Sequence, residues 1–112
     1  MGGKYSYSSC EWYSIEKDVW KSFNPMFNPR HGSTATLLNK ENYIYVVGGY
    51  PLETSSTLIE RFSFATETWE QVHIKLPIAA INNALFPIND TTLAVMSGKY
   101  THSVFLIAFN EF

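Results

Sequence analysis

The side chains best suited to chemistry in this 112-residue chain are three histidines and one cysteine. No two of His31, His73 and His102 lie at a spacing typical of metal ligands, and the single cysteine, Cys10, does not join them in a motif. Histidines with a structural or surface role are therefore favoured over ligands or acid–base groups. Cys10 lies in a run typical of a strand, which favours a buried, unreactive thiol over a nucleophile.

Other signatures of catalysis are missing from the sequence. It contains no Gly-x-Ser-x-Gly elbow, no phosphate-binding loop and no clustered acidic pair. The triplet Asn89-Asp90-Thr91 matches the glycosylation acceptor pattern, but it also has the composition of a β-turn. Without a signal peptide the turn is the better interpretation. We therefore expect neither an enzyme nor a bound cofactor or metal.

Charge and apolar content narrow the class of partner. The net charge is −2 and no basic stripe occurs, which argues against nucleic-acid binding. The sequence has no polybasic patch and no apolar run long enough to span a bilayer, so we expect no membrane association. With 46% hydrophobic residues the chain needs a packed core. The first residues carry no apolar signal segment, which favours a cytoplasmic location.

Short β-rich runs, several of them alternating between apolar and polar residues, dominate the chain. Turn-forming residues such as Asn24-Pro25 and Gly48-Gly49 separate these runs. Runs at such short intervals predict antiparallel strands in a sandwich, a barrel or a propeller. The expected strands are 11–15, 33–38, 43–47, 58–64, 69–74, 84–86, 93–96 and 104–109.

An internal repeat organises these runs. Shifting the chain by 49 positions aligns residues 11–50 with residues 60–99 without a gap. The identical pairs include a tryptophan and a turn glycine, and apolar matches between them keep the alternation of strands. The identities are Glu11 with Glu60, Ser14 with Ser63, Trp20 with Trp69, Ala35 with Ala84, Val46 with Val95 and Gly49 with Gly98. Gly2-Gly3 is a partial third copy of the glycine turn.

The repeat resembles the kelch repeat. Pro29-Arg30-His31-Gly32 opens one strand, and the strand after it ends at Gly48-Gly49. In each copy an aromatic residue then precedes a tryptophan by seven positions. The motif residues are Gly2, Gly3, Tyr13, Trp20, Gly48, Gly49, Phe62, Trp69 and Gly98. The second copy departs from the pattern, with Ala79 at the counterpart of Arg30 and Ser97 in place of the first glycine.

The resemblance implies a partial kelch-type β-propeller, built from antiparallel four-stranded blades. We expect the strand-end glycines to let Trp20 and Trp69 lie against bare backbone. The resemblance also suggests structural hydrogen bonding for Glu11 and Glu60. It divides the chain into the end of one blade (1–28), a complete blade (29–76) and the start of the next blade (77–112).

This number of blades does not close a propeller ring, which takes roughly four to eight. The chain is therefore expected to be a piece of a longer protein or a truncated product. A ring completed by further blades from copies of the chain, or from another subunit, is the second possibility. A free-standing slab is least favoured, because it would expose two apolar faces and unpaired strand edges.

By the same resemblance, the loops at one end of the blades bind another protein and the module is non-catalytic. These loops are rich in residues favoured at the core of interfaces. The candidate partner-binding residues are Tyr5, Tyr7, Arg30, His31, Tyr50, Leu52, Tyr100 and His102. For Tyr50 and Tyr100 packing between blades is an equal alternative, and for Phe27 packing is the favoured interpretation.

Two other functions stay open at this stage. The chain could be a fragment of a propeller enzyme similar to galactose oxidase, although nothing in the sequence specifies the copper site of Tyr, His and Cys side chains that such an enzyme needs. It could also be a truncated kelch product without an independent function. The adaptor domains that would assign a pathway do not occur in this sequence.

Overall fold

The computed structural model describes residues 9–38, 42–50, 56–77, 79–80, 83–96 and 104–109. Every regular element in these residues is a β-strand, which confirms the predicted all-β fold class. In the same residues no helix is long and apolar enough to cross a lipid bilayer. The strands are β1 (Cys10–Ser14), β2 (Val19–Phe23), β3 (Thr34–Leu38), β4 (Tyr43–Val47), β5 (Ile59–Ser63), β6 (Thr68–Val72), β7 (Ala84–Asn89), β8 (Thr92–Met96) and β9 (Val104–Ala108).

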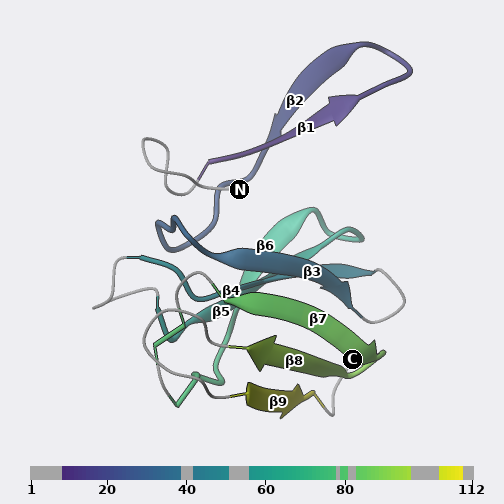
Figure 1. Cartoon of the computed structure of the whole chain (residues 1–112). Coiled ribbons are helices and arrows are strands. Elements are labelled where there is room, and N and C mark those ends of the chain that lie inside the picture. The colour runs from purple at the N-terminus through teal and green to yellow at the C-terminus, as the bar shows by residue number, and fades with distance from the viewer. Residues whose placement is uncertain are drawn as a thin grey trace.

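The strands form three antiparallel sheets, and within each sheet every strand pairs with the next one along the chain. The sheets are the β1–β2 hairpin, a central sheet in the order β3-β4-β5-β6, and a third sheet in the order β7-β8-β9. Figure 1 shows the hairpin at the top of the view, projecting away from the other two sheets. The central and third sheets lie against each other, with β3 and β7 in contact. This is the layered meander that partial propeller blades produce.

The central sheet has buried side chains on both of its faces, since successive side chains on a strand point to opposite sides. We call the contact with the β1–β2 hairpin the first interface and the contact with the third sheet the second interface. The first interface contains Cys10, Met26, Val46, Phe62 and Trp69. The second interface contains Leu38, Tyr45, Val47, Ile59, Leu76, Ala80, Leu93, Val95, Ile107 and Phe109.

The internal repeat is visible in the two hairpins β1–β2 and β5–β6. Tyr13 lies opposite Trp20 in the first hairpin, as Phe62 lies opposite Trp69 in the second. The turns also match, because Asp18 and Glu67 both adopt the left-handed conformation, with φ of 53° and 55°. These two residues are 49 positions apart, the same shift that aligns the sequence copies. The repeat predicted from the sequence is therefore confirmed at the level of the backbone.

Two strands differ from the strands that the sequence predicted. The strand β2 was not among the expected runs, although the repeat with Trp69 implies a strand around Trp20. The strand β7 continues through Pro87 to Asn89, with an irregular register between these two residues. Proline has no backbone N–H to donate to the hydrogen-bond ladder of a sheet. Because β7 lies at the edge of its sheet among the described residues, the missing donor is tolerated there. At the end of β7, Asn89 Oδ1 accepts a hydrogen bond from the amide of Thr91, which confirms the expected turn.

The four strands of the central sheet span residues 34–72 and lie inside the predicted complete blade, 29–76. The hairpin supplies two strands before it and the third sheet supplies three strands after it. The blade boundaries at 1–28, 29–76 and 77–112 stay a prediction.

Candidate binding surface and its framework

A buried ion pair holds the start of the central sheet. The side chains of Arg30 and Glu60 have no exposed surface, and the Arg30 Nε and Nη2 donate to Glu60 Oε2 at 3.1 and 3.0 Å. The Arg30 Nη1 donates to the carbonyl oxygens of Gly48 at 2.7 Å and Leu58 at 2.9 Å. Burial lowers the pKa of the Arg30 guanidinium, and the charge and hydrogen bonds of Glu60 oppose that shift. The guanidinium stays charged, because arginine is not deprotonated in proteins.

The carboxylate of Glu60 also fixes the chain segment ahead of Arg30. It accepts the backbone amide of Phe27 at 2.6 Å and the amide and side-chain nitrogens of Asn28 at 3.3 and 3.2 Å. The structural hydrogen bonding expected for Glu60 is thus confirmed. Its counterpart Glu11 is exposed. Arg30 was expected to contact a partner, but in this structure its side chain is part of the buried framework and presents no surface.

The glycine pair Gly48-Gly49 allows the backbone at Ala80, ahead of β7, to lie close to the central sheet. Both residues have positive φ, 72° and 99°, which glycine adopts without strain. A Cβ on Gly48 would fall 2.2 Å from the carbonyl oxygen of Ala80, and the Gly49 amide donates to that oxygen at 2.8 Å. The glycines therefore make room for backbone. The expectation that tryptophan rings lie against these glycines is wrong, because Trp69 packs in the first interface instead.

The described candidate residues His31 and Tyr50 form a pair on the framework. Their backbones exchange two hydrogen bonds, of 3.2 and 2.7 Å, and their rings stack with centroids 4.9 Å apart at an interplanar angle of 18°. Both side chains are half-buried. We call this pair the His31–Tyr50 surface. The other candidates lie outside the described residues: Tyr5, Tyr7, Leu52, Tyr100 and His102.

The two repeat tryptophans have equivalent positions and different environments. The Trp69 ring is 5% exposed, contacts the Phe62 ring at 5.4 Å and donates its Nε1 hydrogen to the Asn24 carbonyl at 2.7 Å. The Trp20 ring is 69% exposed and contacts Tyr13 at 5.2 Å. Trp69 therefore links the β5–β6 hairpin to the segment directly after β2, and Trp20 does not have such a contact among the described residues.

Cys10 is buried in the first interface, as its place in a strand predicted. Burial raises the pKa of its thiol, which keeps the sulfur protonated at neutral pH. In the part of the chain that the structure describes, no three His, Cys, Asp or Glu side chains converge on a common point.

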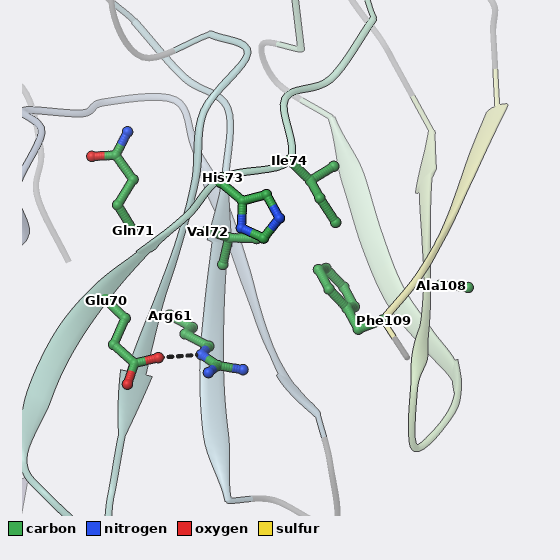
Figure 2. Close-up of a pocket in the computed structure, with 8 residues that line it drawn as sticks. All are labelled: Arg61, Glu70, Gln71, Val72, His73, Ile74, Ala108 and Phe109. Carbon is green, nitrogen blue, oxygen red and sulfur yellow. Dashed lines mark hydrogen bonds and ion pairs between the residues drawn. The ribbon is translucent and has the colours of Figure 1, made fainter. Parts of the chain in front are cut away.

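A pocket of about 300 Å³ opens at the outer edge of the second interface (Figure 2). No pattern in the sequence indicated it. The Arg61 Nε donates to Glu70 at 2.6 Å on one wall, and Ile74 and Phe109 lie on the other. The Arg61 guanidinium also donates to the Tyr45 hydroxyl, whose pKa is raised by burial. The pocket is lined by Arg61, Glu70, Gln71, Val72, His73, Ile74, Ala108 and Phe109.

The position of this pocket could not be predicted from the sequence, because its walls come from two different sheets. Arg61 and Glu70 are cross-strand partners in one hairpin, so a known turn length would have paired them. Ala108 and Phe109 approach from the third sheet through a long-range contact that no local pattern encodes.

The fold and its framework define a class of repeat protein. Three successive antiparallel sheets with a repeated aromatic–tryptophan hairpin and a glycine-edged strand are partial blades of a β-propeller. The family model of the kelch motif matches residues 29–72, which contain the whole central sheet. Residues 29–72 of this chain are therefore similar to the kelch motif.

A curated relative carries the same motif. A RING finger domain and kelch repeat-containing protein from Dictyostelium discoideum is 27% identical to the chain over 72 residues. The match covers 64% of this chain and 7% of that protein, so the chain spans a small part of the relative's length.

Proposed function

We propose that the chain is a non-catalytic protein-interaction module that binds a partner through the His31–Tyr50 surface. Kelch repeats generally mediate protein–protein interactions, and the residues 29–72 match that motif. The observation that carries the finer proposal is the stacked His31 and Tyr50 pair, held by two backbone bonds directly beside the buried Arg30. Aromatic rings on a rigid support lose little conformational freedom on binding, which favours affinity.

The framework beneath this surface supports a binding role rather than a catalytic one. Arg30, which directly precedes His31, and its partner Glu60 direct their hydrogen bonds to each other and to backbone groups. Groups committed in this way stabilise loops and are not placed to transfer protons to a ligand. The RING finger named in the Dictyostelium relative belongs to that protein, and we assign no such domain here.

Site-specific photocrosslinking in cells tests the proposal. A photoreactive phenylalanine analogue is placed at Tyr50 and, as a matched control, at Phe86, which is exposed on β7. We expect a discrete protein adduct from position 50 and none from position 86. The purified partner should then lose at least tenfold in affinity when His31→Ala is introduced, measured by calorimetry. Equal adducts from both positions, or unchanged affinity for His31→Ala, would reject the proposed surface.

A further inference from the structure

The connection between β2 and β3, residues 24–33, carries buried and exposed side chains in turn. Met26 and Arg30 are buried, while Phe27 and Pro29 between them are exposed. The Phe27 ring is 64% exposed, although the sequence favours packing for this residue. A single exposed apolar side chain is normal on a protein surface, so the ring gains meaning only from what holds it and what lies beside it.

Hydrogen bonds fix the backbone beneath the Phe27 ring. The Phe27 amide donates to the Glu60 carboxylate at 2.6 Å. Three residues earlier, the Asn24 carbonyl accepts the Trp69 indole at 2.7 Å. The β2–β3 connection also contains two prolines, whose rings restrict the backbone. A side chain presented by such a rigid segment loses little conformational entropy when a partner covers it.

The same carboxylate joins Phe27 to the His31–Tyr50 surface. Glu60 accepts hydrogen bonds from the Phe27 amide and from the Arg30 guanidinium. The guanidinium also donates to the carbonyl directly after β4, two residues before Tyr50. His31 directly follows Arg30 in the chain. Phe27 and the His31–Tyr50 surface are therefore supported by one buried hydrogen-bond network.

The exposed part of the β2–β3 connection carries no full charge. Arg30 is the one residue of this connection that is charged when histidine is neutral. The side chains of Arg30 and its partner Glu60 have no exposed surface, and their charges are paired. A charged partner would lose hydration here without gaining an opposite charge on the connection. The connection therefore favours contact with apolar, uncharged groups.

We propose that Phe27 extends the His31–Tyr50 surface and that the partner contributes an uncharged segment whose apolar side chains cover the Phe27 ring. This inference rests on the function proposed above and adds the chemistry of the partner to it. The contact forms without ion pairs, so salt has little to screen.

Selection from a random peptide library tests this chemistry. Phage-displayed random peptides are selected on the 112-residue chain, and the enriched peptides are synthesised with a fluorescein label. Peptides whose affinity falls at least tenfold with His31→Ala, followed by anisotropy, define the ligands of the His31–Tyr50 surface. We expect these peptides to be apolar and uncharged, and we expect Phe27→Ala to weaken their binding at least tenfold.

Two control variants separate loss of the ring from damage to the fold. Phe27→Leu keeps an apolar side chain and should weaken binding less than threefold. Phe86→Ala removes another exposed ring, on β7, and should leave binding unchanged. Phe27→Ala keeps the amide that Glu60 accepts, so its melting curve should match that of the unsubstituted chain.

A salt titration on the unsubstituted chain makes the test independent of any substitution. Raising sodium chloride from about 50 to about 500 mM should change the affinity of these peptides less than about twofold. A fall of more than tenfold, or enrichment of acidic or basic peptides, would overturn the inference.

The remaining outcomes distinguish this inference from the function on which it rests. Peptides that need His31 but bind the Phe27→Ala variant equally well would overturn the inference and leave the His31–Tyr50 surface as a binding site. If no enriched peptide needs His31, the proposed surface fails and the inference fails with it. Self-association of the chain that Phe27→Ala removes, measured by sedimentation, would make a second copy the occupant and reject a segment of another protein.

Discussion

The β1–β2 and β5–β6 hairpins have the same register and the same left-handed turn position, yet they differ in what they bury. Trp69 is 5% exposed and Trp20 is 69% exposed. The local sequence therefore specifies strand pairing and turn shape, while burial depends on a neighbouring sheet. Trp69 has the β1–β2 hairpin against it. The two hairpins therefore separate the contribution of the local sequence from the contribution of a neighbouring sheet. Substitutions at positions related by the shift of 49 measure each contribution.

The largest effect is expected at the pair Glu60 and Glu11. Glu60→Ala leaves the buried Arg30 guanidinium without its carboxylate and releases the Phe27 and Asn28 amides, so it should lower the free energy of unfolding by about 4–5 kcal/mol. Glu11→Ala removes an exposed side chain and should change stability by less than about 0.5 kcal/mol. Urea denaturation followed by circular dichroism provides the measurement. Similar losses at both positions would contradict the framework role of Glu60.

The next effect is expected at the tryptophans. Trp69→Ala should cost about 3–4 kcal/mol, because it empties a buried ring site and frees the Asn24 carbonyl. Trp20→Ala should cost less than about 1 kcal/mol, since that ring is mostly in solvent. Thermal melting of the two variants measures the difference. If Trp20→Ala were as damaging as Trp69→Ala, the hairpin would have a burying neighbour that this comparison leaves out.

A smaller, kinetic effect tests how the hairpin is attached. Because Cys10 is buried in the first interface, the thiol should react with a maleimide only when the hairpin separates from the central sheet. We expect Trp69→Phe, which loses the bond to Asn24, to speed labelling by about tenfold, the equivalent of roughly 1.4 kcal/mol. Trp20→Phe is the control and should leave the rate unchanged. Identical rates in the two variants would show that the indole bond does not hold the hairpin.

The smallest effect concerns the turns, where the two hairpins are alike. Glu67 adopts a left-handed backbone conformation, which is strained for a residue with a side chain and not for glycine. Glu67→Gly should therefore raise the free energy of unfolding by about 0.5–1 kcal/mol. Asp18→Gly should gain less, because it also removes the bond between the Tyr13 hydroxyl and the Asp18 carboxylate. Chemical denaturation of both variants tests this order. A loss of stability at Glu67→Gly would show that the turn is not strained.

The sequence predicted the parts of the molecule that repeat locally. The shift of 49 positions matched Tyr13 with Phe62 and Trp20 with Trp69, and the structure pairs the aromatic residue with the tryptophan across the hairpin in both copies. The ion pair of Arg30 with Glu60 bridges thirty positions, and only the resemblance to the kelch repeat suggested hydrogen bonding for Glu60. Contacts between separate sheets follow from three-dimensional packing, which no run of residues encodes.

The same limit applies to Arg30 and to the glycine pair Gly48-Gly49. Arg30 has the side chain of a surface residue, but its burial is decided by Glu60 and by two carbonyls on other strands. The glycine pair signalled a close approach, and the structure identifies the approaching group as the Ala80 carbonyl instead of an indole. In both cases the sequence indicated that something must lie nearby without indicating which group.

The contact at Ala80 bears on how such repeats diverge. The amide of Gly49 donates to the Ala80 carbonyl, and the Ala80 amide donates to the carbonyl of Ser56. These two bonds use main-chain atoms alone, so they do not depend on the identity of the side chain at position 79. The second copy of the repeat has Ala79 at the counterpart of Arg30, and the backbone bonds at Ala80 form without an arginine there. The absence of a Cβ at Gly48 is what leaves room for the Ala80 carbonyl, whichever side chain stands at position 79.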